Sequence, residues 1–227
     1  MRFRDRTHAA QLLAARLKGE YAPPFVICGI PGGGLAIARV LAHELQVPLT
    51  VAHVRRLFVP SAPLSSFGAL DERGSAVLDP AAVRALKLTL ADLEHARTRA
   101  WRELHRRSAL LRDVMSLRDL ATHRHVVLTD EGAATGFTLL AAIRAARRLN
   151  AARVSVAVPC ASEPALERVV READDVVCLG GSDGFTSIAG CYKRFEEEAP
   201  EHAHRLSGAV PHGTAHGGAT RPSLTPR

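Results

Sequence analysis

The residues with the clearest chemical use lie between positions 126 and 138, in the sequence VVLTDEGAATGFT. Two adjacent acids, Asp130 and Glu131, follow a short apolar run and precede a loop of small residues. Carboxylates in such a place suit sugar hydroxyls or a hydrated Mg2+. Apolar residues recur at helical spacing after the loop, and the first N–H groups of a helix attract a phosphate. The segment therefore predicts a site for a diol beside a phosphate, as in a ribose 5-phosphate.

The loop itself has the composition that a phosphate cradle needs. Glycine and alanine let the backbone approach an anion closely, and threonine hydroxyls add hydrogen-bond donors. An ordinary strand-to-helix turn without a ligand is the alternative interpretation. The residues expected to bind the sugar phosphate are Ala133, Ala134, Thr135, Gly136, Phe137 and Thr138.

The order of apolar strand, acid pair and Thr-Gly-x-Thr resembles the 5-phosphoribosyl-1-pyrophosphate (PRPP) signature of type I phosphoribosyltransferases. The resemblance implies that Asp130 and Glu131 hold the ribose hydroxyls and, indirectly through water or the ribose, a Mg2+ cofactor. It also implies that residues 134–138 hold the 5-phosphate. One position departs from the pattern, because Glu131 stands where the family usually has Asp.

A second glycine-rich loop, Gly29-Ile30-Pro31-Gly32-Gly33-Gly34, follows the apolar run 25–28. It lacks the Gly-Lys-Ser/Thr ending of a Walker A loop. A dinucleotide site would need an acid after the next strand, where this chain has Arg55-Arg56, although a 2′-phosphate could bind those arginines. The loop also resembles the pyrophosphate loop of the same transferases, which usually reads Gly-x-Pro-Arg-Gly-Gly in the bacterial stand-alone subgroup. That resemblance implies pyrophosphate on the amides of Gly32, Gly33 and Gly34.

The pyrophosphate loop departs from the family pattern at Gly32, which replaces the arginine that would hold the charge of the leaving group. Arg55 and Arg56 are the nearest cations that could take this role, and two exposed charges at a strand end are the alternative. The short segment Phe3-Arg4-Asp5-Arg6 also resembles the beginning of the same subgroup.

The composition limits the classes of partner. The 30 Lys and Arg residues exceed the 23 acids, which gives a formal charge of +7 that favours anionic ligands. We expect no nucleic acid, because the basic segments lack interleaved aromatic residues and known binding motifs. Four cysteines without metal-ligand spacing are typical of reduced core thiols. With no apolar run long enough for a signal peptide or membrane span, we expect a cytoplasmic protein and no membrane partner.

The elements predict an α/β fold with a doubly wound, mainly parallel five-stranded sheet. We expect strands at 25–28, 49–54, 126–128, 154–158 and 176–179, a basic loop from 55 to 66, and a hairpin of 67–71 with 75–78. A long helix over 89–115 carries an apolar stripe that must pack on something, so a homodimer is possible. The predicted domain covers residues 1–198 with a helical hood insert at 80–120, and residues 199–227 form a disordered tail.

The predicted function is transfer of a phosphoribosyl group from PRPP to an unidentified nitrogenous base, with release of pyrophosphate. Asp130, Glu131, Arg55 and Arg56 are the predicted catalytic residues. The alternative is a regulatory protein that binds PRPP or a nucleotide and has little or no turnover. Gly32 and Glu131 are the two positions that favour this alternative.

Overall fold

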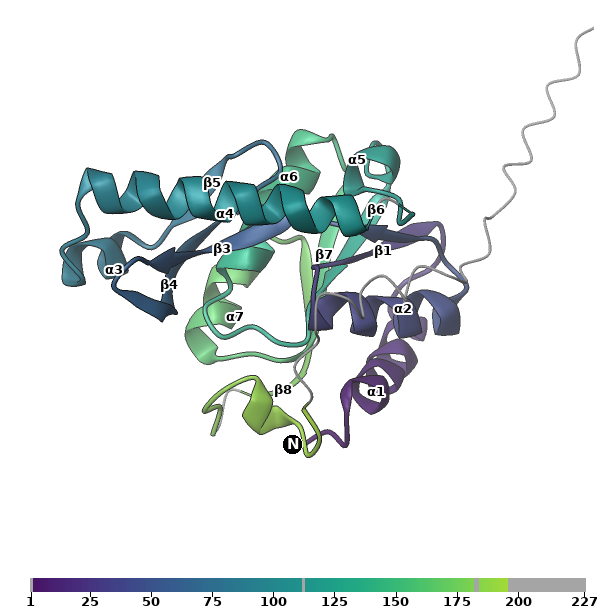
Figure 1. Cartoon of the computed structure of the whole chain (residues 1–227). Coiled ribbons are helices and arrows are strands. Elements are labelled where there is room, and N and C mark those ends of the chain that lie inside the picture. Colours follow the sequence, from purple (N-terminus) through teal and green to yellow (C-terminus); the bar gives the residue numbers. More distant parts are fainter. Residues whose placement is uncertain (1, 112, 182–183, 196–227) are drawn as a thin grey trace, which may run out of the picture.

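The structure, a computed structural model, describes residues 2–111, 113–181 and 184–195. The tail predicted for residues 199–227 lies outside the described residues. A five-stranded sheet forms the centre of the fold, and all of its neighbouring strands pair in parallel (Figure 1). Its order is β2 (Leu49–Val51), β1 (Phe25–Gly29), β6 (His125–Thr129), β7 (Arg153–Cys160) and β8 (Asp175–Gly180). The predicted parallel five-stranded α/β fold is confirmed.

Helices cover both faces of this sheet. Side chains of a strand alternate between faces, so Val26 and Ile27 enter two different hydrophobic cores. One core contains α1 (Arg6–Lys18) and α2 (Gly33–Leu45), and the other contains α6 (Phe137–Arg148) and α7 (Glu163–Val170). Because both faces are buried, the strands are apolar along almost their whole length, as the sequence pattern indicated.

A second, antiparallel sheet consists of β3 (Val54–Val59), β4 (Ala62–Asp71) and β5 (Ala76–Leu78). The predicted strand 49–54 ends at Val51, and the loop predicted for 55–66 was wrong, since most of it belongs to β3 and β4. The physical reason is alternation, because Leu57 and Val59 are buried on one face of β3. The predicted hairpin of 67–71 with 75–78 is confirmed.

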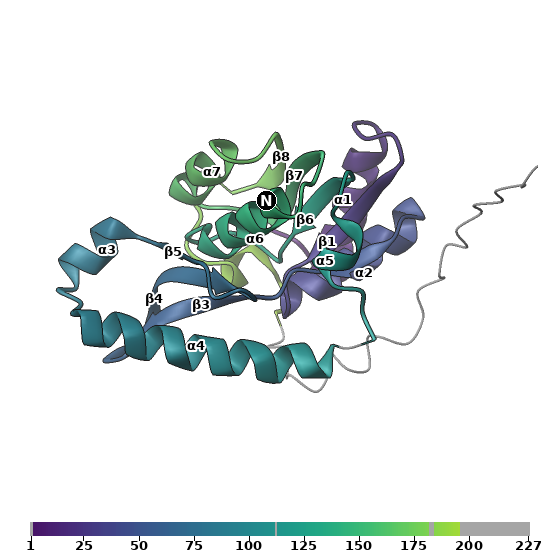
Figure 2. The ribbon, with the colours of Figure 1, turned by 90° about the horizontal axis from the view of Figure 1, so that it is seen from above.

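The long helix predicted for 89–115 is α4 (Leu90–Leu110), which begins at a capping box formed by Thr89 and Asp92. Its buried residues Ala96, Ala100 and Leu104 pack on the small sheet. Figure 2 shows α4 along the side of the small sheet that faces away from α6. The middle of the apolar stripe is therefore covered within the chain, whereas Leu90 and Met115 at its two ends are exposed. Short helices α3 (Pro80–Ala85) and α5 (Leu117–Leu120) flank α4.

The first and last described segments lie side by side. Phe3 N–H donates to the Cys191 carbonyl (2.7 Å), and Lys193 N–H donates to the Phe3 carbonyl (2.8 Å). This pairing places the beginning of α1 next to the segment that follows the 3-10 turn Ala189–Cys191. Among the described residues, no helix has both the length and the apolar character that a membrane crossing requires.

Candidate functional site

The two glycine-rich loops of the sequence meet at the carboxyl ends of β1 and β6. These strands are neighbours, with Gly29 beside Thr129 in register, and Ile30 N–H donates to the Thr129 carbonyl (3.1 Å). Ligands of open parallel sheets bind at this edge, in the crevice beyond the strand ends. The loop from Gly29 to Gly34 and the acid pair are thus side by side, as the sequence order predicts.

Gly33 and Gly34 are glycine because the acid pair occupies the space of a side chain. A Cβ on Gly33 would lie 1.7 Å from Glu131 Oε2, and a Cβ on Gly34 would lie 2.7 Å from Asp130 Oδ1. Real Cβ atoms do not approach neighbours so closely. Gly32 differs, since it has a φ of 109° and nothing within 4 Å of its Cβ position. Gly33 and Gly34 therefore allow the first glycine loop to contact the acid pair, whereas the open side of that loop is at Gly32.

Glu131 is held by both ends of the described chain. Its Oε2 atom accepts from Arg6 Nε at 2.7 Å and lies 2.7 Å from Arg6 Nη2, with Arg6 at the first position of α1. Its carbonyl oxygen accepts from the Tyr192 hydroxyl at 2.6 Å. The side chains of Arg6 and Glu131 are only 14% and 20% exposed, so this ion pair is shielded from water. The second acid is thus engaged by a cation of the protein.

Asp130 is half-buried, and its pKa is raised to about 7. Burial is the main cause and the Glu131 charge adds to it, whereas Arg56 and Arg6 act in the opposite direction. One carboxylate oxygen, Oδ1, accepts from the Glu131 N–H at 2.8 Å. An acid with a pKa near neutrality can exchange a proton at physiological pH, which is what a general acid or base needs.

The loop after the acid pair ends at the uncapped beginning of α6. Gly136 is the N-cap residue in the left-handed conformation, with φ 79°, and no described side chain caps the helix. The carbonyl oxygens of Ala134 and Thr135 accept from the Ser162 hydroxyl (2.7 Å) and from Arg168 Nη1 (3.2 Å). Because Ser162 is the N-cap of α7 and Arg168 lies within it, these bonds attach the loop carbonyls to α7. The first N–H groups of α6, near the half-exposed Thr138, are therefore a suitable place for an anion.

The predicted cations Arg55 and Arg56 have different surroundings because neighbouring residues of a strand point to opposite faces. Arg55 lies on the α4 face of β3, where Nη2 is 3.9 Å from Glu103 Oε1. Burial and the nearby Arg107 lower the Arg55 pKa to about 10. The Arg56 charge, in contrast, acts on the Asp130 carboxyl. Of the two, Arg56 is the one that the structure brings toward the acid pair.

A groove of about 1070 Å³ runs between β3 and the flank of α4. Arg56, whose charge acts on the Asp130 carboxyl, lines this groove, and Phe58 contributes an aromatic ring with the Arg56 guanidinium 5.0 Å from its centroid. Cations outnumber acids along its walls, because Glu94 and Glu103 face five arginines. The arginines are Arg55, Arg56, Arg99, Arg102 and Arg106.

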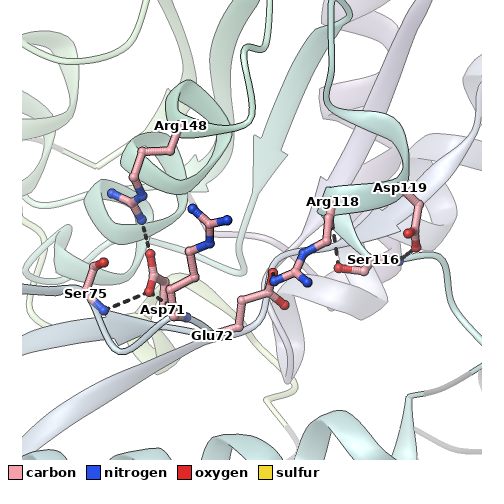
Figure 3. Close-up of polar contacts among 8 residues, drawn as sticks. Asp71, Glu72, Ser75, Ser116, Arg118, Asp119 and Arg148 are labelled. Carbon is pink, nitrogen blue, oxygen red and sulfur yellow. Dashed lines mark hydrogen bonds and ion pairs between the residues drawn. The ribbon is translucent and has the colours of Figure 1, made fainter.

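The small sheet is fixed to α6 by a buried carboxylate at the end of β4 (Figure 3). Asp71 has a 2% exposed side chain and forms an ion pair with Arg148 of α6. Its Oδ1 atom accepts from the Arg73 and Ser75 N–H groups, both at 2.9 Å. The same turn is linked to α5 through Glu72 and Arg118, 3.1 Å apart. The turn therefore connects the small sheet, which carries Arg56 on β3, to α6, at whose beginning the phosphate site is predicted.

Sequence reasoning missed the contacts of Arg6, Arg148 and Tyr192. The partners of these residues lie 125, 77 and 61 positions away along the chain. One signal was present, since Phe3 to Arg6 resembles the beginning of the transferase subgroup. For Arg148, nothing in the local pattern distinguishes it from the exposed cations of the same helix.

The donor set permits a magnesium ion that the ligand shares with the protein. The described residues include no cluster of three or more His, Cys, Asp or Glu side chains that could hold a metal alone. Mg2+ is commonly bound by one or two carboxylates together with substrate phosphates and water. The half-buried Asp130 fits that arrangement, whereas the Glu131 carboxylate is engaged with Arg6.

Comparisons with known proteins agree with this geometry. Residues 71–192 match the family described as "Phosphoribosyl transferase domain". A Mycobacterium tuberculosis H37Rv protein named "Putative phosphoribosyl transferase Rv0571c" is 36% identical over 199 residues. The match covers 88% of this chain but 45% of that protein, so the chain spans about half the length of this relative. The crystal structure of TT1426 from Thermus thermophilus is 35% identical, with a TM-score of 0.73, and the match covers 91% of this chain and 98% of that one. The chain belongs to the phosphoribosyl transferase domain family.

Proposed function

We propose that the protein transfers a phosphoribosyl group from PRPP to a nitrogenous base and releases pyrophosphate. The observation that carries the proposal is the half-buried Asp130 carboxyl followed, six residues later, by the uncapped beginning of α6 at Gly136. This arrangement offers a carboxylate to the ribose hydroxyls and helix N–H groups to the 5-phosphate. Family membership supports the same class of reaction.

The reaction breaks the bond between ribose C1 and the pyrophosphate oxygen, and pyrophosphate leaves with the electron pair. The acceptor nitrogen forms the new bond to C1, and its proton must be removed. Asp130, whose pKa of about 7 allows it to take up a proton, is the group we assign to this step. The Asp130 charge also opposes the positive charge that develops on the sugar. Bound Mg2+ would offset the negative charge of the pyrophosphate.

We assign the pyrophosphate to the open side of the first glycine loop. Gly32 leaves the space beside its backbone free, and the amides of Gly32 to Gly34 precede or begin α2. Arg56 supplies the positive charge nearest to the acid pair from β3, while Arg55 stabilises Glu103 on α4. Neutralising Arg56 should then weaken PRPP binding more than neutralising Arg55.

We assign the acceptor to the groove between β3 and α4, because Arg56 lines both the groove and the acid-pair side of β3. The excess of arginines over glutamates along its walls favours a base that carries a carboxylate or another anionic group. In the panel of bases tested as acceptors, anionic heterocycles should therefore be more active than neutral purines. A homodimer and a cytoplasmic location stay predictions from the sequence.

A second candidate is a regulatory protein that binds PRPP without turning it over. Two observations favour it. The pyrophosphate loop has Gly32 in place of a cation, and the Glu131 carboxylate is paired with Arg6. In this case PRPP binding would be intact, and no base would lead to pyrophosphate release.

Calorimetric titration with PRPP, with and without Mg2+, tests the shared part of both proposals. The Asp130→Asn, Thr138→Ala double variant should lose the Mg2+-dependent binding. A matched control is Asp113→Asn with Thr122→Ala, because both residues are exposed and lie outside the acid pair and the two glycine-rich loops. Pyrophosphate release with a panel of bases then separates transferase from regulator. Absence of PRPP binding at millimolar concentration would refute both.

A further inference from the structure

Arg6 lies where the two loops of the proposed site meet. Its Nε and Nη2 atoms are both 2.7 Å from the same oxygen of Glu131. The guanidinium carbon lies 4.4 Å from the ring centroid of Phe195, so an aromatic ring covers one side of the cation. Only 14% of the Arg6 side chain is exposed, so its guanidinium is held in place by its neighbours.

The same arginine reaches the glycine loop. An ideal Cβ on Gly33 would lie 2.7 Å from Arg6 Nε and 1.7 Å from Glu131 Oε2. The ion pair therefore rests against the backbone at Gly33, one residue after the position where the family loop usually has an arginine. A cation from α1 thus stands beside a loop that has none of its own.

We propose that Arg6 is a positioning residue that fixes Glu131 against Gly33 and so holds the acid loop and the glycine loop in register. This inference rests on the proposed function, because the register matters for a ligand that spans both loops. In this arrangement Glu131 acts as a structural support, and Asp130 is the carboxylate that meets the ribose.

Removing Arg6 would leave the Glu131 carboxylate without its partner in a place that is only 20% exposed and that touches the Gly33 backbone. The contact between the acid loop and the glycine loop should then loosen.

The first test is the affinity for PRPP in the presence of Mg2+, measured by calorimetry in the wild type and in Arg6→Met. PRPP spans both loops, so its affinity should fall by roughly 10- to 100-fold, the size of effect that misplaced binding groups produce. The affinity for ribose 5-phosphate, which would need the acid loop alone, should fall much less.

Two further variants and one control separate positioning from folding. Arg6→Lys keeps the charge but loses the forked donor geometry, so PRPP affinity should recover only in part. Arg6→Met with Glu131→Gln removes both charges, so it avoids an unpaired buried charge and keeps the test usable if Arg6→Met alone fails to fold. It should still bind PRPP weakly, because the contact between the loops is missing. Arg16→Met, which changes an exposed α1 arginine paired with Glu20, should leave both affinities unchanged.

The two proposals fail in different ways. A wild-type protein that does not bind PRPP would refute the proposed function. A folded Arg6→Met variant with wild-type affinity for PRPP would refute the role of Arg6.

Discussion

Replacing Arg148 by Met should destabilise the protein strongly, because it removes the charged partner of the buried Asp71 (Figure 3). The Asp71 side chain is 2% exposed and cannot reach water for compensation. Breaking a buried ion pair by removing one partner typically costs about 3–5 kcal/mol. Two backbone N–H groups still bind the carboxylate, and each such bond to a charged group contributes about 1.5–3 kcal/mol. We therefore expect a loss of about 2–3 kcal/mol, somewhat below the range for a fully isolated charge.

The matched control is Arg144→Met on the same helix. Arg144 forms an ion pair with Glu172, but the two side chains are 47% and 28% exposed. Water solvates such pairs well, and their contribution to stability is about 0–1 kcal/mol. Both variants remove one arginine from α6, so helix propensity and net charge change equally. Only the burial of the partner carboxylate distinguishes them.

Urea unfolding, followed by far-UV circular dichroism, gives the free energy of unfolding of each variant. A double-mutant cycle with Asp71→Asn then isolates the coupling between Asp71 and Arg148. The reasoning would be refuted if Arg148→Met cost no more than Arg144→Met, or if the coupling energy were zero. A second readout is PRPP affinity, which should weaken because the pair joins β4 to α6, at whose beginning we propose that the 5-phosphate binds.

Three further predictions concern Asp130, Gly33 and His125. Asp130 ionises near pH 7 in the folded protein and near pH 4 when unfolded, so folding loses stability as pH rises through this window. Asp130→Asn should therefore raise the thermal midpoint most at about pH 8, progressively less at lower pH and not at about pH 3, while it abolishes PRPP binding. Gly33→Ala should lower the free energy of unfolding by about 1–3 kcal/mol, because the new Cβ would be overpacked against Glu131. Gly19→Ala should not, since its Cβ would lie 3.7 Å from the Arg16 carbonyl oxygen, and urea unfolding compares the two variants. Burial lowers the His125 pKa below its value in the unfolded chain. The free energy of unfolding is therefore unaffected by this group above about pH 6.5 and declines as pH falls below that value. His125→Gln should flatten that decline in unfolding curves measured from about pH 8 to 5.

The sequence alone was sufficient for the local parts of the site. An apolar run, the acids and the small-residue loop follow one another in the chain, so β6, Asp130 and the beginning of α6 could be predicted from spacing. The parallel sheet followed from alternating strands and helices. Contacts between distant residues could not be predicted in this way, because periodicity reports burial and not partner identity. Arg6 with Glu131 and Arg148 with Asp71 are of this kind.

The different surroundings of Arg55 and Arg56 were within reach of sequence reasoning. Residues 54–59 contain apolar side chains at Leu57 and Val59, which is typical of a strand with one buried face. The neighbouring proline- and serine-rich stretch predicted a loop instead, and a loop does not impose alternation on two adjacent arginines. The segment forms a strand of the small sheet because α4 covers the apolar face of that sheet. This helix lies 30 or more residues later in the chain, so the local pattern does not indicate it.

The two departures from the family pattern lie at one contact. Glu131 has one methylene more than the usual Asp, and its carboxylate extends to Arg6 and to the space above Gly33. An aspartate at this position would withdraw its carboxylate from both contacts. Because Arg6 and Glu131 form an ion pair without net charge, the longer side chain joins the two loops but does not replace the cation that Gly32 lacks. A leaving pyrophosphate would then depend on Arg56 and Mg2+ for its charge, so the assay of pyrophosphate release, and not the contact of Glu131 with Arg6, separates the two candidate functions.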